Sequence, residues 1–146
     1  MIRRNDAGYE LSDDPARLDL DTVTGFLATA YWSSHRPRAT IERAIAHSLS
    51  VGLYAPDSTQ AGFARAVSDH AAFGYLADVF VLPEHRGRGL ARFMVAALLE
   101  HPDLAGVERW ILATADAHGV YAALGFEPLP DPGLFMVRQS TTSPGR

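Results

Sequence analysis

The sequence of 146 residues contains no cysteine. Disulfide frameworks, thiolate metal sites and cysteine nucleophiles are therefore excluded as explanations of its fold or chemistry. The sequence also lacks a long apolar run, so we expect no transmembrane helix. No apolar stretch follows the basic residues near the N-terminus, so we expect no signal peptide. Together these absences favour a cytoplasmic protein.

Common metal, nucleotide and nucleic-acid signals are missing as well. The six histidines are scattered, without an HExxH pattern or a close ligand pair on one face, so we expect no metal site. No Gly-Lys-Ser/Thr tripeptide is present, which excludes a Walker phosphate loop. Gly87 and Gly89 lack the third small residue of a dinucleotide-binding fingerprint. The net charge of -4 argues against a nucleic-acid-binding protein.

The composition that remains is that of a globular protein, with 47% hydrophobic and 21% charged residues. A chain of this length suffices for one domain with a single core. We expect one domain over residues 1–139 and a flexible, polar C-terminal tail over residues 140–146.

Apolar periodicity and turn residues divide the chain into strands and helices. Spacings of three and four predict helices, and short β-rich runs between turn residues predict strands. The expected strands are 9–12, 50–54, 60–67, 73–82, 109–113, 126–129 and 134–137, and the expected helices are 19–31, 40–48, 90–100 and 116–124. The order β-α-α-β-β-β-α-β-α-β-β predicts an α/β fold with a mixed sheet of six to seven strands, about four helices and one parallel crossover.

One strand-turn-helix stretch carries the strongest functional signal. A short apolar run at 79–82 precedes an Arg-Gly-Arg-Gly turn at 86–89, and a helical pattern begins at Leu90. Free backbone N–H groups and the positive end of the helix dipole bind phosphate at such a helix N-terminus. The glycines let a ligand approach the backbone closely, and Arg86 and Arg88 add positive charge. We therefore expect a phosphate-bearing ligand at this turn.

This turn resembles the acyl-CoA signature of the GNAT superfamily of N-acyltransferases, where Arg or Gln is followed by two residues, Gly, one residue, and Gly or Ala. Arg86, Gly89 and Ala91 occupy those positions. The element order is similar to that of GNAT domains over nearly the whole chain. The resemblance implies acetyl-CoA as cosubstrate, with its pyrophosphate on the turn and its pantetheine arm along the preceding strand. The implied CoA-binding residues are Val79, Phe80, Val81, Arg86, Gly87, Arg88, Gly89, Leu90 and Ala91.

A second motif lies in the last predicted helix. Tyr121 precedes Gly125 and Phe126 with the spacing of the GNAT element Tyr-x-x-x-Gly-Phe. In that family this tyrosine commonly donates a proton to the departing CoA thiolate, and the resemblance implies the same catalytic role for Tyr121. The residue type suits the task, because a thiol has a pKa of about 8.5 and a phenol a pKa of about 10. The alternative interpretation is that Tyr121 only packs its helix onto the sheet.

An amine acceptor must lose a proton before it attacks. The pKa of an alkyl amine is about 10.4, so only about one molecule in two thousand is neutral at pH 7. Asp78 is the first candidate for the base, and strand alternation predicts that it shares a face with Leu76 and Phe80. The competing interpretation of Asp78 is a structural carboxylate paired with an arginine. Glu84 and His85 are further candidates for the base.

The acceptor site is expected in the front half of the chain. Tyr31 and Trp32 are candidates for its wall, because aromatic faces bind cations, and core packing is the alternative. Arg65 lies within an apolar strand, where a charge needs a partner. It is expected either to bind a substrate carboxylate or to pair with Asp78 or Asp69.

The sequence thus predicts an acetyl-CoA-dependent N-acetyltransferase that acts on a primary amine of a small or amino-acid-like acceptor by direct attack. A protein or peptide N-acetyltransferase is the alternative enzyme. A catalytically silent, acyl-CoA-binding regulatory module is the alternative from another class. We expect acetyl-CoA and a small amine as partners, without nucleic acid or membrane, and the family resemblance makes a homodimer an expectation.

Overall fold

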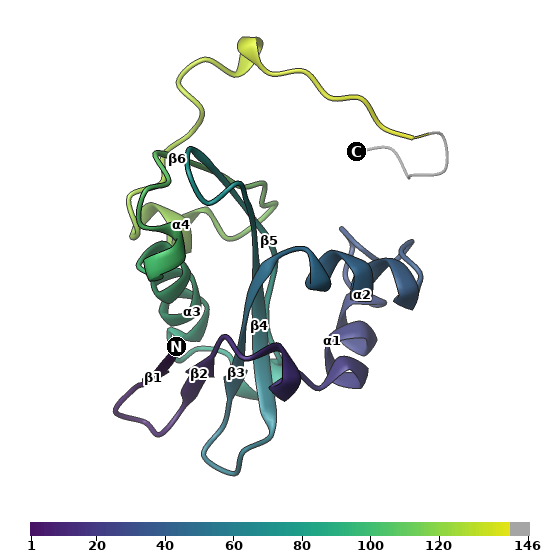
Figure 1. Ribbon diagram of the computed structural model, residues 1–146, viewed down its shortest axis with the longest axis vertical. Helices are drawn as coiled ribbons and strands as arrows, with labels where there is room; N and C mark the ends of the chain where they lie inside the picture. Colours follow the sequence, from purple (N-terminus) through teal and green to yellow (C-terminus); the bar gives the residue numbers. More distant parts are fainter. Residues whose placement is uncertain (141–146) are drawn as a thin grey trace.

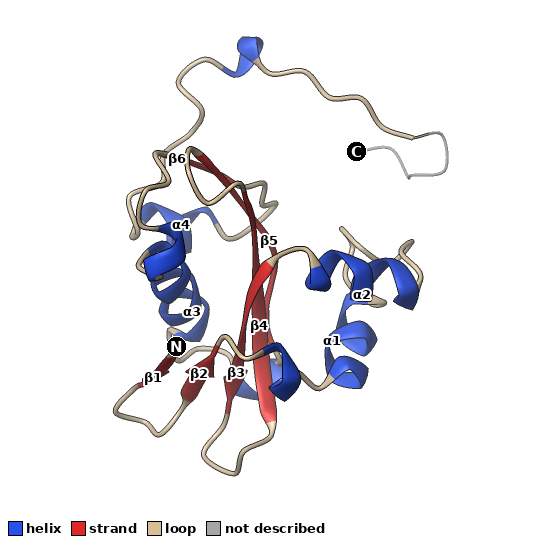
Figure 2. Ribbon diagram, viewed as in Figure 1, coloured by secondary structure: helices blue, strands red, loops and turns tan. Residues whose placement is uncertain are grey.

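The computed structural model describes residues 1–140, and a six-stranded mixed sheet with helices on both faces forms its centre (Figures 1 and 2). The strands are β1 (Ile2–Arg4), β2 (Glu10–Ser12), β3 (Leu49–Tyr54), β4 (Gln60–Ser68), β5 (Phe73–Val81) and β6 (Arg109–Ile111). The α-helices are α1 (Leu20–Leu27), α2 (Arg38–Ala46), α3 (Leu90–Leu99) and α4 (His118–Ala122). Four 3-10 turns lie at η1 (Pro15–Arg17), η2 (Pro83–His85), η3 (Pro102–Leu104) and η4 (Pro132–Leu134). The α/β class, the mixed sheet and the four helices are as predicted.

The strands are arranged in the sheet in the same order as in the chain. β1 to β5 are antiparallel neighbours, and β6 pairs in parallel with β5 after the crossover through α3. Strand β1 was not predicted, because Ile2–Arg4 is short and mostly charged and shows no apolar alternation. It forms a hairpin with β2 over a turn in which the Asn5 side chain accepts hydrogen bonds from the N–H groups of Ala7 and Tyr9.

Two apolar layers hold the helices against the sheet. On one face, buried side chains from the strands pack against α3. Leu11 and Leu53 of the strands and Met94 and Leu98 of α3 are fully buried in this layer. On the other face, Val23 and Leu27 of α1 and Ile41 and Ile45 of α2 pack around Phe63 and Phe80. Figure 1 shows α3 and α4 on one side of the sheet and α1 and α2 on the other. Burying such a side chain stabilises the fold by about 1.5–3 kcal/mol.

The predicted strand pair at the C-terminal end, 126–129 and 134–137, does not form in the structure. Instead the chain runs away from the sheet (Figure 1), and Leu134 and Met136 are 77% and 98% exposed. Proline recurs at positions 128, 130 and 132, and a residue without a backbone N–H cannot donate to a strand ladder. The predicted tail over 140–146 lies outside the described residues except for Ser140.

The missing strand pair also changes the surroundings of β6. The predicted buried strand 109–113 is shorter, Arg109–Ile111, and only half-buried, because none of the strands in the described part of the chain covers its outer edge. Within residues 1–140, none of the helices is long and apolar enough to cross a membrane.

Candidate active site

A cavity opens where β5 and β6 separate. The two strands pair only between Phe73–Tyr75 and Arg109–Ile111, and beyond these residues each strand end forms a wall of its own. The cavity has a volume of about 340 Å³, within the range of small-molecule sites. Its walls come from residues 75–79 of β5, residues 112–117 after β6, Tyr121 of α4, and Tyr31, Trp32 and Arg36 of the linker between α1 and α2. The structure therefore brings Tyr31, Trp32, Asp78 and Tyr121 to one place.

A bulge in β5 aims Asp78 at the helices α1 and α2. A single β4 residue, Ala64, lies opposite two β5 residues, Asp78 and Val79, and Asp78 has a positive φ of 54°. The extra residue reverses the two-residue alternation of the strand. As a result Leu76 packs in the α3 layer and Phe80 in the α1–α2 layer. The prediction that Asp78 shares a face with both of these residues is therefore wrong.

Three N–H donors surround the Asp78 carboxylate, which is 7% exposed. Oδ1 accepts from Trp32 Nε1 at 3.0 Å and from Arg36 Nη1 at 3.3 Å, and Oδ2 accepts from Arg65 Nε at 2.9 Å. Of the alternatives for Arg65, the structure has the pair with Asp78. Arg65 is buried, and its Nη1 also donates to Ser48 Oγ at 3.0 Å. The carboxylate therefore joins β4, β5 and the α1–α2 linker, and its role as the base stays a prediction.

Arg36 was not predicted as a site residue. It lies in an Arg-Pro-Arg loop without periodicity. Asp78 is 42 positions further along the chain, and the two residues meet only in the folded structure. Its one distinctive feature in the sequence is its closeness to the aromatic pair Tyr31 and Trp32.

Tyr31 and Trp32 form the wall on the linker side. The Tyr31 hydroxyl accepts a hydrogen bond from the Ala115 N–H at 3.2 Å, so it bridges the linker to the segment after β6. The two rings meet edge to face with centroids 5.1 Å apart, and Trp32 also packs beside Phe26 of α1. The pair thus contributes both to the cavity wall and to packing.

Tyr121 lines the cavity from the short helix α4. Its ring packs edge to face on Phe126 with centroids 5.9 Å apart, and its hydroxyl makes no hydrogen bond with any residue within 1–140. Burial raises the pKa of Tyr121 above its usual value, and the nearby Tyr31 and Asp116 raise it further. The phenol is therefore protonated at neutral pH, which is the form that a proton donor needs.

The Arg-Gly-Arg-Gly turn lies at the other end of the same β5 strand and leads into α3. Gly87 and Gly89 have positive φ values of 81° and 72°, and a Cβ on either would meet nothing within 4 Å. Gly89 is the N-cap of the ten-residue helix α3, and no side chain caps its first N–H groups. Arg86 Nε donates to the carbonyl of Val81 at 3.0 Å, while Arg88 is exposed. The turn thus has the accessible backbone donors that a phosphate requires.

The other candidate bases are not in the cavity. Glu84 and His85 belong to η2 and are absent from its lining, and His85 Nδ1 shares a hydrogen bond of 2.8 Å with the Tyr9 hydroxyl. Within residues 1–140, no group of three or more His, Asp or Glu side chains is arranged to hold a metal ion.

Comparison with known proteins gives relatives in sequence and in structure. A structure from Xanthomonas campestris pv. campestris, provisionally described as an acetyltransferase of the GNAT family, is 44% identical with a TM-score of 0.86, over 92% of this chain and 94% of that one. A Deinococcus radiodurans structure with 19% identity and a TM-score of 0.72 shares the fold, over 97% of this chain and 94% of that one. A Gibberella zeae protein with a provisional acetyltransferase name is 32% identical over 63% of this chain, and the match spans 63% of its own length.

The sequence model of the acetyltransferase (GNAT) family matches residues 16–126. This range includes α1, the β5 bulge, the glycine turn and Tyr121, and so contains every wall of the cavity. The match covers most of the chain and confirms the resemblance that the turn and the tyrosine motif indicated. The chain belongs to the acetyltransferase (GNAT) family.

Proposed function

We propose that this protein transfers an acetyl group from acetyl-CoA to a primary amine of a small acceptor by direct attack. The observation that carries the proposal is the state and position of the Tyr121 hydroxyl in the cavity. It is protonated at neutral pH, lacks a hydrogen-bond partner within residues 1–140, and lines the cavity between β5 and β6. Family membership supports acyl transfer as the reaction class.

The binding site proposed for acetyl-CoA follows β5 toward α3. The N-terminal N–H groups of α3 and the glycines of the turn suit the pyrophosphate, since the Cβ positions of Gly87 and Gly89 face open space. The pantetheine arm would bond to the edge of β5 that β6 leaves free after Tyr75. The residues proposed to hold the cosubstrate are Val79, Phe80, Val81, Arg86, Gly87, Arg88, Gly89, Leu90 and Ala91.

Acetyl-CoA supplies a thioester whose carbonyl carbon accepts the amine. As the new C–N bond forms and the C–S bond breaks, the Tyr121 hydroxyl donates a proton to the departing sulfur. The proton of the amine leaves to a base or to water, and Asp78 is the proposed base. A covalent enzyme intermediate is not required, which agrees with the absence of cysteine from the sequence.

The cavity favours a small acceptor over a peptide. The hydrogen bond between Tyr31 and the Ala115 N–H joins the linker to the segment after β6, and both segments line the cavity. A peptide chain laid between these two segments would have to break this contact, whereas a small molecule would not. The volume of about 340 Å³ agrees with such a ligand.

Release of free thiol from acetyl-CoA tests the proposal. The panel contains amino acids, polyamines, aminoglycosides and short peptides, and Tyr121→Phe serves as the control. We expect at least one amine to be acetylated by the wild type and far more slowly by the variant. Tight acetyl-CoA binding without turnover of any amine would contradict the proposal and favour an acyl-CoA-binding module.

A further inference from the structure

We infer that the acceptor carries a carboxylate beside its amine, and that Arg36 binds this carboxylate. The inference rests on the proposed function and names the substrate class of the same cavity. It also assigns a specificity-determining residue that the motifs of the sequence do not indicate. Among the charged side chains at the cavity, Arg36 has the most donors left for a ligand.

Arg65 neutralises Asp78 and has little capacity left. Its side chain is only 10% exposed, and it donates from Nε to Asp78 and from Nη1 to Ser48. The shorter of the two arginine contacts to Asp78 is this one, at 2.9 Å. Arg65 is thus a buried partner of the carboxylate rather than a ligand for a substrate.

Arg36 is in the opposite situation. It makes one contact to Asp78, at 3.3 Å from Nη1, and its side chain is 27% exposed in the cavity wall. A guanidinium has five N–H donors, so most of those of Arg36 remain available to a ligand. Because Arg65 already balances the charge of Asp78, Arg36 brings an uncompensated positive charge to the linker wall. A carboxylate matches this fork of donors in charge and geometry.

The linker holds Arg36 in place for this task. The Arg36 N–H donates to the Ser33 carbonyl at 2.9 Å, and the fully buried Ser33 hydroxyl donates to the Leu27 carbonyl at 2.7 Å. The neighbouring Trp32 is fixed by its bond to Asp78. These bonds fix the backbone from which Arg36 extends, and the contact with Asp78 holds Nη1, so the side chain loses less conformational freedom when a ligand binds.

The cavity lining also contains a negative charge, the side chain of Asp116, which can attract the amine of the acceptor. Asp116 is exposed, lines the cavity from the segment after β6, and lies close enough to Tyr121 to raise its pKa. Asp116 therefore attracts an ammonium group in the cavity, and Arg36 attracts a carboxylate. This distribution fits an amino acid, whereas a polyamine would place a second positive charge against Arg36. One available arginine suits a singly charged carboxylate rather than a phosphate.

Matched acceptors test the inference. Amino acids that turn over are compared with their α-carboxamides and with the corresponding decarboxylated amines, which keep the amine and lose the negative charge. A charge-assisted hydrogen bond pair predicts that kcat/KM of the wild type is about tenfold to hundredfold higher for the acid. In Arg36→Gln we expect this ratio to fall to about one, mainly through a higher KM for the acid. Arg36→Lys keeps the charge and should restore part of the ratio.

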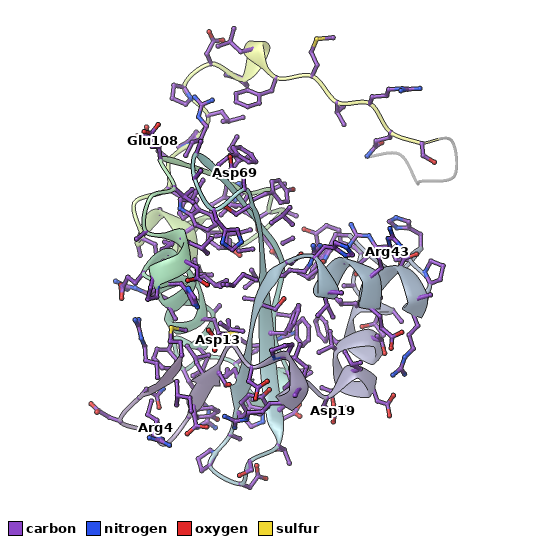
Figure 3. The ribbon with its side chains drawn as sticks, viewed as in Figure 1. Arg4, Asp13, Asp19, Arg43, Asp69 and Glu108 are labelled. Carbon is purple, nitrogen blue, oxygen red and sulfur yellow. The ribbon has the colours of Figure 1, made fainter. Side chains whose placement is uncertain are left out.

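Arg43→Gln is the matched control. Arg43 lies exposed on α2 (labelled in Figure 3) and is outside the cavity lining. The same change of charge there should leave the ratio unaltered, and thermal unfolding should show that all variants fold.

Equal rates for acids and amides in the wild type, or an unchanged ratio in Arg36→Gln, would overturn the inference while leaving the proposed function intact. If no amine is acetylated although acetyl-CoA binds, the proposed function fails, and the inference fails with it.

Discussion

The indole N–H of Trp32 donates a hydrogen bond of 3.0 Å to Oδ1 of Asp78, which lies 46 positions further along the chain. This bond ties the α1–α2 linker to the bulge in β5. Arg36 and Arg65 donate to the same carboxylate from the linker and from β4. Asp78 is therefore the point at which β4, β5 and the α1–α2 linker are joined beside the cavity.

Asp78→Asn separates the structural role of this carboxylate from its predicted role as the base. Asparagine tolerates the positive φ at this position, so the backbone of the bulge should be preserved. Losing the charge leaves Arg65 buried without a counterion, and breaking a buried ion pair costs about 3–5 kcal/mol. We expect the free energy of unfolding in urea to fall by about this amount.

The pH dependence of kcat/KM then tests the base in the same variant. If Asp78 accepts the proton of the amine, the rise of kcat/KM with pH should be flattened in Asp78→Asn. A rise that remains as in the wild type would assign the proton to another group or to water. Asp21→Asn is the control, because Asp21 pairs with Arg38 on the surface and lies outside the cavity.

Tyr121→Phe should lower kcat by about tenfold to a thousandfold and leave acetyl-CoA affinity nearly unchanged. Phenylalanine keeps the contact of the ring with Phe126 and removes only the hydroxyl. The raised pKa means that the phenol stays protonated through the neutral range. At pH values below about 10, loss of this proton should therefore not reduce kcat. Steady-state kinetics measure the change in kcat, and calorimetry measures the affinity for acetyl-CoA. A variant as fast as the wild type would leave Tyr121 with a packing role alone.

Gly89→Glu should abolish CoA binding, since it places a negative charge at the N-terminus of α3 where the pyrophosphate is proposed to lie. The substitution also strains the backbone, because φ is 72° at this position. Gly89→Ala carries the strain without the charge and is the matched control. We expect calorimetry to show a much larger loss of affinity for the glutamate variant. Equal losses in both variants would remove the electrostatic argument for a phosphate site.

The turn between β4 and β5 should be sensitive to acid. Asp69, which is labelled in Figure 3, accepts hydrogen bonds from the N–H groups of Ala71, Ala72 and Phe73. These bonds lower the pKa of Asp69 to about 2. Since the folded-state pKa lies below the ordinary value of 3.8, the stabilisation is complete above pH 4 and is lost as the pH falls toward 2. Amide resonances of the three residues should titrate together with a midpoint of about 2. A midpoint near 3.8 would show that the three bonds do not form in solution.

Apart from β1, the order of strands and α-helices up to α4 could be predicted because each of these elements carries its own periodicity. The apolar spacing of Val23 and Leu27, or the strand that ends in Val81, depends on neighbours in the sequence alone. The glycine turn and Tyr121 were recognisable for the same reason, because their residue types and spacings are local.

The bulge in β5 was not predictable in this way. Leu76, Asp78 and Phe80 alternate like one face of a regular strand, and nothing nearby signals the extra residue. Its cause is long-range, because the donors from Trp32, Arg36 and Arg65 surround the carboxylate only once the sheet and the linker have assembled. The role of Arg36 was hidden for the same reason.

The C-terminal strands show the reverse error. The run from Leu134 to Val137 has the apolar composition of a strand, which was sufficient to predict one. A strand needs a partner with free N–H groups, and the preceding prolines at 128, 130 and 132 interrupt the return segment. Composition alone therefore overestimated the sheet.

The extra residue at Asp78 lets β5 present a carboxylate to the linker while the strand stays paired with β4 on both sides of the bulge. Deleting Asp78 would restore one-to-one pairing at Ala64 and leave Phe80 opposite Phe63, but it would remove the group that joins β4, β5 and the linker around the cavity. If the proposed function holds, new acceptor preferences are therefore accessible mainly through the α1–α2 linker and residues 112–117, where side chains can change without altering the bulge. For protein engineering, the linker and residues 112–117 are thus the segments to vary, and the strands of the sheet are the part to keep unchanged.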